Sequence, residues 1–243
     1  MQKLIAYPLS IIYYLLFGST IVIFQVIQWI CFNLFGYYAH KRSVDFLCFF
    51  LVANTYALGT RYKVKGVEKL PVGVPLIIAS NHQSLYDITA LGWFLRKVHP
   101  KYISKIELGK GIPSFSYNLQ HGGSVLIDRD DPKQSLSAIR KMAEYIETHK
   151  RSTVIFPEGT RSKTGKPKPF MTNGLKILCK YAPSAYMVPV TINNSWKMTR
   201  WGSFPLGIGS KFELIVHDPI PVKDMPFPEL FEKTEQAVIR DII

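Results

Sequence analysis

Residues 75–87 read PLIIASNHQSLYD, and this stretch decides how the rest of the chain can be interpreted. Its first half, Leu76–Ser80, is an apolar run with the length of a buried strand. A helical pattern follows from Asp87 to Lys97. His82 is therefore expected in the turn where a buried strand becomes a helix, with Asp87 in the first helical turn. Open α/β sheets place their ligands at this kind of junction.

His82 and Asp87 form a candidate catalytic pair. A carboxylate that holds one imidazole nitrogen leaves the other nitrogen free to take a proton from a hydroxyl. In one continuous helix, positions five apart are separated by about 140° around the axis, so the pair can meet only if His82 lies in the turn. The alternative is a surface turn in which Asp87 only favours the helix N-terminus. His40 and Asp45 have the same spacing, and nothing else around them suggests a site.

The chain after residue 60 alternates between strand-like and helical patterns. The clearest helix is Pro132–His149, which Asp131 can cap and whose first position suits Pro132. Further helices are expected at 173–181 and 228–240, and a loop at 201–210. Such alternation predicts an α/β fold with a mixed, largely parallel sheet flanked by helices. The strand-like runs are residues 62–65, 76–80, 101–104, 124–127, 153–156, 187–192 and 212–217.

The N-terminal segment is unusually apolar. From Leu4 to Ala39, 36 residues include no Asp, Glu, Lys or Arg. A transmembrane helix needs only about 20 residues, and a helix of this length would measure about 54 Å. The segment is therefore expected to tilt, to break near Pro8 or Gly18, or to lie partly in the membrane interface.

A second apolar stretch, residues 46–58, is too short to cross a bilayer comfortably. We interpret residues 1–59 as a membrane-anchoring helical hairpin, interfacial or re-entrant, and residues 60–243 as an α/β domain. One true span with an interfacial helix is an alternative, and a buried core helix is another. If the segment spans, the Lys41 and Arg42 flank predicts that the domain lies on the cytoplasmic face of the cell membrane.

The formal net charge of +13 limits the classes of partner. A basic protein attracts phosphate groups, anionic lipids, acidic proteins or nucleic acid. Here the charges are dispersed and the N-terminus is apolar, which argues against a nucleic-acid partner. The three cysteines show no spacing typical of a metal site or a disulfide framework.

Residues 156–162, FPEGTRS, follow another expected buried strand. Gly159 permits close approach of the backbone to a ligand, and Thr160 offers a hydroxyl. Arg161 carries a planar guanidinium suited to phosphate, and Glu158 could hold that arginine or a substrate hydroxyl. The stretch predicts an anion site, with an ordinary basic turn as the alternative. It is not a P-loop, because the required glycine and lysine spacing is absent.

Two further stretches carry weaker signals. Residues 122–129, GGSVLIDR, end in Arg129, which could reach the same phosphate or could form only a surface pair with Asp128. Pro189 lies inside a strand-like run, which predicts an edge, bulge or mouth position in the sheet, with a plain edge strand as the simplest case.

Taken in order, these four stretches resemble the motifs of the glycerolipid acyltransferase family, to which the 1-acylglycerol-3-phosphate acyltransferases belong. The resemblance covers residues 60–195. Residues 81–87 resemble its His-x4-Asp motif, residues 105–129 its second motif, residues 156–162 its third and residues 188–190 its fourth.

The resemblance implies roles for particular residues. His82 would be the catalytic base and Asp87 its partner. It also implies a fatty acyl thioester donor, carried by acyl-carrier protein or coenzyme A, and neither a metal nor another cofactor. The residues that would bind the acceptor and its phosphate are Lys105, Arg129, Glu158, Gly159, Thr160 and Arg161.

The function implied is a membrane-bound O-acyltransferase that acylates the sn-2 hydroxyl of 1-acylglycerol 3-phosphate and gives phosphatidic acid. Two departures leave the acceptor open: Ser116 stands where the family usually has glycine, and residues 170–174 replace its Phe-Lys-x-Gly pattern. One alternative is an acyltransferase for another lysophospholipid or an amino-acid-containing lysolipid. A non-catalytic membrane lipid-binding protein is the other.

Overall fold

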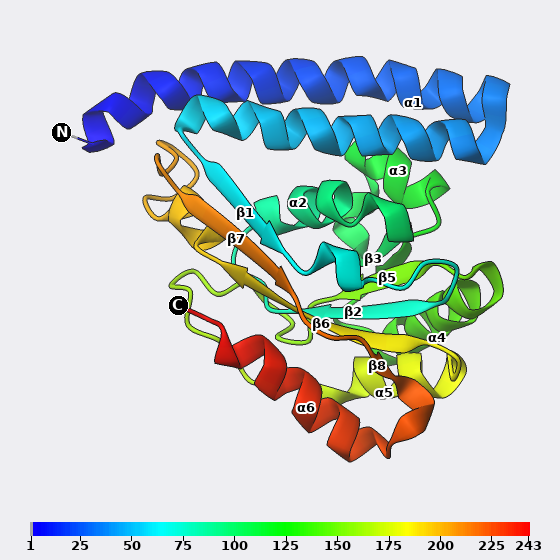
Figure 1. The fold of residues 1–243 in the computed structure, drawn as a ribbon. Coiled ribbons are helices and arrows are strands. Elements are labelled where there is room, and N and C mark those ends of the chain that lie inside the picture. Colours follow the sequence, from blue (N-terminus) through cyan, green and yellow to red (C-terminus); the bar gives the residue numbers. More distant parts are fainter. Residues whose placement is uncertain (1) are drawn as a thin grey trace.

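A mixed eight-stranded sheet forms the middle layer of the structure (Figure 1), a computed structural model that describes residues 2–243. The strands are β1 (Arg61–Lys65), β2 (Leu76–Ser80), β3 (Pro100–Lys105), β4 (Val125–Ile127), β5 (Ser152–Ile155), β6 (Tyr186–Asn193), β7 (Lys211–Val216) and β8 (Ile220–Pro221). Their order is β1-β7-β6-β2-β5-β3-β4, and β8 pairs with β6. Only the pairs that β6 forms with β7 and β8 are antiparallel. The expected mixed, largely parallel sheet is confirmed.

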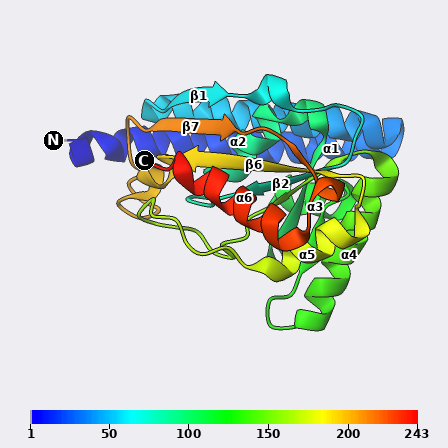
Figure 2. The same cartoon turned by 60° about the horizontal axis from the view of Figure 1, so that its bottom comes forward.

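Helices cover both faces of this sheet because its central strands are apolar on both sides. In β2, Ile78 packs toward α2 while its neighbour Ile77 packs toward α4 and α5. Figure 2 shows α4, α5 and α6 in front of the sheet and α1 behind it. The α-helices after α1 are α2 (Tyr86–Phe94), α3 (Phe115–His121), α4 (Pro132–His149), α5 (Thr172–Tyr181) and α6 (Phe227–Arg240).

Local signals located the long elements and missed the short ones. The α4 helix has the expected bounds, and Asp131 caps it by accepting hydrogen bonds from the amides of Lys133 and Gln134, each at 3.0 Å. The seven-residue α3 and the two-residue β8 were not expected. Elements of this length are too short to show a hydrophobic period.

The N-terminal segment is a hairpin of two helical arms, labelled α1 (Gln2–Asn54) as a whole (Figure 1). The arms separate at Gly36, where φ is 78° and ψ is −168°. The expected break near Pro8 or Gly18 is wrong, because the helix continues through both. Near the N-terminus a proline removes only one helical hydrogen bond, and a single glycine is tolerated at about 1 kcal/mol. Gly36 adopts a positive φ that other residues rarely adopt.

Polar side chains fasten the hairpin to the domain. Gln25 accepts a hydrogen bond from the Ser114 amide at 2.7 Å, and the Ser114 hydroxyl donates to the Ile21 carbonyl at 2.6 Å. Asn33 donates to the Tyr117 hydroxyl at 3.2 Å. These contacts join the first arm to α3 and its preceding turn, so the hairpin has a fixed position on the domain.

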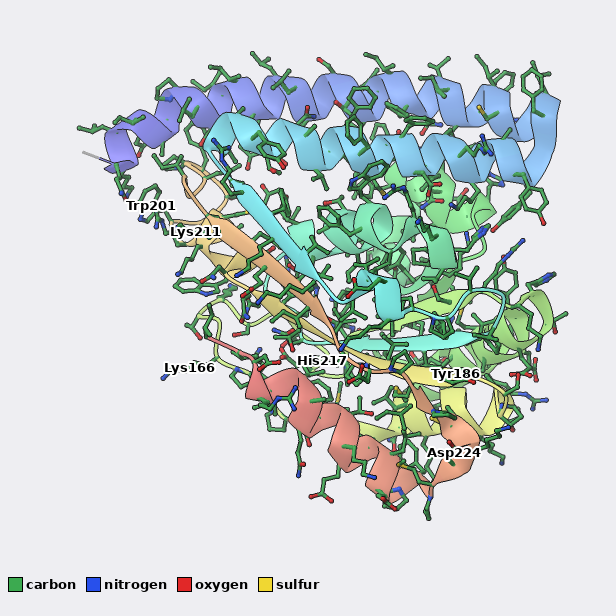
Figure 3. All side chains as sticks on the ribbon, viewed as in Figure 1. Lys166, Tyr186, Trp201, Lys211, His217 and Asp224 are labelled. Carbon is green, nitrogen blue, oxygen red and sulfur yellow. The ribbon has the colours of Figure 1, made fainter. Side chains whose placement is uncertain are left out.

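The outer face of the hairpin is apolar and uncovered. Of the 30 large apolar side chains that are exposed in the described chain, 20 lie in residues 2–58. Only 17% of its most apolar window is buried, so the alternative of a buried core helix is wrong. By length and composition this helix could cross a membrane. Figure 3 shows side chains along the outer arm that point away from the domain.

Pro189 occupies a central strand, which corrects the expectation of a plain edge strand. On one side Pro189 pairs with Ala79 of β2. On the other side β6 changes partner, because β7 ends at Val216 and β8 begins at Ile220. The Pro189 carbonyl accepts a hydrogen bond from the His217 amide at 3.0 Å. The residue that lacks an N–H therefore lies at an interruption of the ladder, where no donor is needed.

Candidate active site

His82 and Asp87 meet at the carboxyl end of β2. The Nδ1 atom of His82 lies 2.8 Å from Oδ2 of Asp87. The His82 side chain is 14% exposed and that of Asp87 is fully buried. Within residues 2–243, the Nε2 atom of His82 has no hydrogen-bond partner. Because the carboxylate accepts from Nδ1–H, the unprotonated nitrogen is Nε2, which is the one available to take a proton.

Asp87 is held in place by three further donors. Its Oδ2 accepts hydrogen bonds from the amides of Gln83 at 2.7 Å and Ser84 at 2.9 Å. The Ser84 hydroxyl donates to Oδ1 at 3.1 Å and accepts from the Tyr86 amide at 3.3 Å. This network closes the turn before α2, whose N-cap residue is Leu85. It also means that Ser84 is committed to structure rather than free as a nucleophile.

Two residues of the first motif, Asn81 and Gln83, tie the turn to β6 and to the residues that follow it. The amide of the Asn81 side chain exchanges two hydrogen bonds with the backbone of Ile192 in β6, at 2.8 and 2.7 Å. Gln83 Oε1 accepts from the Ser195 amide at 3.1 Å. Sequence reasoning did not assign roles to Asn81 and Gln83. Buried amides beside a catalytic turn are the signal that could have identified them, since such groups must find partners.

The loop after β5 lies beside this turn because β5 pairs with β2, with Ala79 opposite Ile155. The Phe156 ring stacks on the His82 ring at a centroid distance of 4.0 Å and an angle of 15°. The Ser162 amide donates to the His82 carbonyl at 2.7 Å. The first and third motifs are therefore in direct contact, and the stacking fixes the plane of the imidazole.

Gly159 turns this loop with a φ of 69°. A Cβ atom at this position would collide with the methyl group of Met171. The exposed Met171 side chain could move aside, so it is the positive φ that favours glycine here. Its amide donates to the Phe156 carbonyl at 3.0 Å, which completes the turn.

Glu158 is only 6% exposed, and neither carboxylate oxygen has a hydrogen-bond partner within the described part of the chain. Burial raises the pKa of this carboxyl from 4.5 to about 7, although the nearby amides of Lys168 and His82 oppose the rise. It pairs with none of the arginines, which differs from one expected role. Two unpartnered acceptors beside His82 could receive a substrate hydroxyl.

The raised pKa of Glu158 predicts a pH-dependent stability. Between pH 4.5 and about 7 the folded chain keeps a proton that the unfolded chain releases, so stability falls as pH rises through this window. The loss is expected to be on the order of 2 kcal/mol. Urea unfolding at pH 5 and pH 8 measures it. In Glu158→Gln the difference between the two pH values is expected to shrink by that amount. An unchanged difference would show that Glu158 titrates normally.

The basic residues predicted to bind phosphate stand at the same sheet edge. Lys105 ends β3, and Arg129 follows β4, which pairs with β3 in parallel. Arg161 lies in the loop after β5. All three side chains are exposed, and within residues 2–243 none forms a hydrogen bond or ion pair through its charged group. The structure brings Arg161 near His82, because the next residue, Ser162, donates to the His82 carbonyl, while Lys105 and Arg129 stand two and three strands away from β2.

Lys168 contacts the loop after β5 directly. Its ammonium donates to the Thr160 hydroxyl at 2.6 Å and to the Arg161 carbonyl at 3.1 Å. Thr160 is therefore partly engaged by its own loop. Lys166 lies further along the same loop, and Figure 3 shows its side chain at the outside of the molecule. Lys168 thus shapes this loop from within.

The profile of the Acyltransferase family matches residues 61–193, which include all of these site residues. This chain belongs to the acyltransferase family. A 1-acyl-sn-glycerol-3-phosphate acyltransferase from Helicobacter pylori is 34% identical over 187 residues, which cover 76% of this chain and 75% of that protein. A chloroplastic 1-acyl-sn-glycerol-3-phosphate acyltransferase from Brassica napus is 31% identical over 158 residues, or 65% of this chain and 44% of that protein.

A solved acyltransferase structure has the same fold. The crystal structure of the 1-acyl-sn-glycerophosphate acyltransferase PlsC from Thermotoga maritima superposes with a TM-score of 0.79 and 23% sequence identity. The match covers 100% of this chain and 96% of that one. The N-terminal hairpin is therefore included in the shared fold, together with the acyltransferase domain.

Proposed function

We propose that this acyltransferase moves a fatty acyl group from a thioester donor to the sn-2 hydroxyl of 1-acylglycerol 3-phosphate, giving phosphatidic acid. The observation that carries the proposal is the His82–Asp87 pair, 2.8 Å apart, beside the loop that holds Arg161, whose next residue Ser162 donates to the His82 carbonyl. A base beside an anion-binding loop suits an alcohol that carries a phosphate. The names of the relatives support the same acceptor.

The reaction needs one proton carrier. As the acceptor oxygen attacks the thioester carbonyl, its proton passes to His82 Nε2, and Asp87 stabilises the charged imidazole. Collapse of the tetrahedral intermediate breaks the C–S bond, and the leaving sulfur takes the proton from His82. The acceptor oxygen is itself the nucleophile, so no acyl-enzyme forms. Acyl-carrier protein and coenzyme A both supply such a thioester, and the basic surface would attract either.

The hairpin would hold the domain at the membrane that contains its lipid substrates. Its uncovered apolar face supports an interfacial or re-entrant position. In that arrangement the domain lies on the cytoplasmic face of the cell membrane, with the lysophospholipid acceptor and the bilayer as its partners.

A transfer assay with purified protein tests this function. Lysophosphatidate, lysophosphatidylglycerol and an amino-acid-containing lysolipid are each offered with acyl-carrier-protein and coenzyme A thioesters. Turnover is expected to be highest with lysophosphatidate. Turnover only with the phosphate-free lysolipid would favour the alternative acceptor, and binding without turnover would favour a lipid-binding protein.

Neutralising the two arginines of the site is expected to weaken acceptor binding. A charge-assisted hydrogen bond contributes about 1.5–3 kcal/mol, so Arg161→Gln should raise KM for lysophosphatidate about 10- to 100-fold. Arg129→Gln should do the same if its side chain reaches the phosphate from β4. KM for a monoacylglycerol, which lacks the phosphate, is expected to change little in either variant. An equal rise with both acceptors would mean that the arginines support the fold of the site instead.

A further inference from the structure

An open cavity of about 670 Å³ lies where the second arm of the hairpin meets the end of α2. Its lining includes four cationic side chains: Lys41 and Arg42 from the second arm, and Arg96 and Lys97 from the turn that follows α2. Asp45 is the one carboxylate among the lining residues of the described chain. The cavity therefore presents an excess of positive charge.

This cavity is separate from the active site. The α2 helix begins beside His82 at the carboxyl edge of the sheet and runs back along it. Arg96 and Lys97 follow the end of α2, next to the start of β3 at Pro100, which is the amino edge. A strand of five residues separates the two edges by about 17 Å. None of the residues that line the cavity belongs to the candidate active site.

Most of the positive charge has no counter-ion. Lys41 pairs with Asp45 at 2.5 Å and donates to the Arg96 carbonyl at 3.0 Å. Arg96 lies over the Trp93 ring at 3.8 Å and donates to the Trp93 carbonyl at 2.8 Å, which holds its guanidinium in place. Arg42 and Lys97 are exposed, and across residues 2–243 neither forms a hydrogen bond or ion pair through its charged group. Three cations are thus available to one anion.

His99, which lines the cavity, and Lys101, two residues further along in β3, experience the same positive field. Lys101 is 6% exposed, and burial, with help from Arg151 and Lys41, lowers its pKa to about 7. Burial and the charge of Lys101 likewise lower the pKa of His99 to about 3. Cations that disfavour one another's charge would be stabilised by an anion at this place.

The rim of the cavity joins the uncovered apolar face of the hairpin. Tyr38 and Phe46, both lining residues, are 74% and 56% exposed. Trp93 packs against Phe49 of the second arm at a centroid distance of 4.9 Å. A ligand that fits both parts has an anionic head and an apolar tail.

We propose that this cavity binds the phosphate of an anionic phospholipid headgroup whose acyl chains lie along the hairpin beside Phe46. Arg42, Arg96 and Lys97 contact the phosphate, and the aromatic rim contacts the upper part of the chains. The site rests on the membrane attachment proposed above, but it does not depend on the transfer reaction. It gives the hairpin a preferred lipid in addition to its general affinity for bilayers.

Lipid titration in a neutral detergent tests the site without the surface potential of a bilayer. Short-chain phosphatidylglycerol is added to purified protein, and native mass spectrometry measures the number of lipids retained. One lipid per chain is expected. Arg42→Gln/Lys97→Gln should weaken its binding at least about tenfold. Lys176→Gln/Lys223→Gln removes the same charge from exposed positions on α5 and after β8, and it should bind like the wild type.

Three further measurements identify the ligand and the place where it binds. Arg129→Gln/Arg161→Gln should retain the lipid, since a loss there would put it in the active site. Phosphatidylcholine should bind at least tenfold more weakly, and inorganic phosphate should not compete at equal concentration. Equal binding of either would overturn the proposal.

Asp45→Asn gives an effect of the opposite sign. Removing the one lining carboxylate frees Lys41. It also removes a repulsion of about 1 kcal/mol between Asp45 and the bound anion, so phosphatidylglycerol should bind about fivefold more tightly. Weaker or unchanged binding would overturn the site. Flotation with neutral vesicles is the separate test of membrane attachment: failure there would refute the attachment, while the detergent titration would still report on the cavity.

Discussion

Replacing His82 by alanine is expected to lower kcat by about 10²- to 10⁴-fold, the usual contribution of a positioned general base. The variant retains the anion-binding loop and Asp87, so KM for lysophosphatidate should change much less. Thiol release from the acyl donor, followed with and without acceptor, measures the loss. More than a tenth of the wild-type kcat in the variant would refute His82 as the base.

Asp87→Asn distinguishes a working pair from two adjacent residues. The carboxylate accepts from His82 Nδ1 and from the amides of Gln83 and Ser84. An asparagine has one acceptor oxygen and cannot stabilise a charged imidazole, so kcat should fall about 10²-fold or more. Because the two residues act as one unit, the double variant should be no slower than His82→Ala alone. Multiplicative losses would mean that they act independently.

Charging the outer face of the hairpin is expected to release the protein from membranes. Leu15 and Val22 are 67% and 58% exposed and lie on one side of the first arm. Burying an apolar side chain of this size contributes about 1.5–3 kcal/mol, so Leu15→Glu/Val22→Glu should reduce the partition into neutral vesicles about 100-fold or more. Flotation with vesicles measures the partition.

The chain offers a matched control for this change. Leu136 on α4 and Ile239 on α6 are 40% and 37% exposed, on the face of the domain that lies away from the hairpin. Leu136→Glu/Ile239→Glu makes the same chemical change and should partition like the wild type. If both double variants lose vesicle binding equally, the hairpin is not the membrane-binding element.

Much of the fold follows from local patterns in the sequence. Strand-like runs located seven of the eight strands, and β2 has the predicted bounds. The α4 helix carries its period, its cap and its first-turn proline within the segment itself, so it was predictable in full. The turn at His82 was predictable for the same reason: strand, turn and helix follow one another in the chain.

The neighbours of each element could not be predicted in the same way. Pro189 suggested an edge strand, but β6 is central and the proline lies where one antiparallel partner ends and the next begins. Glu158 suggested either an ion pair with arginine or a contact with a substrate hydroxyl. Burial in the folded domain instead leaves its carboxylate unpartnered. Both outcomes depend on segments distant in sequence.

The sequence by itself determined the strand-turn-helix that carries His82 and Asp87, because the hydrogen bonds to the Asp87 carboxylate come from residues at most five positions away. Only the tertiary structure decided that the hairpin turns at Gly36 and that Asp45 shares a cavity with Arg96 and Lys97. Lys41, four residues before Asp45, is a local partner, but Arg96 and Lys97 come from a segment about 50 residues further along the chain. Short-range spacing encodes a local turn, whereas a charged cavity arises only when packing brings separate elements together.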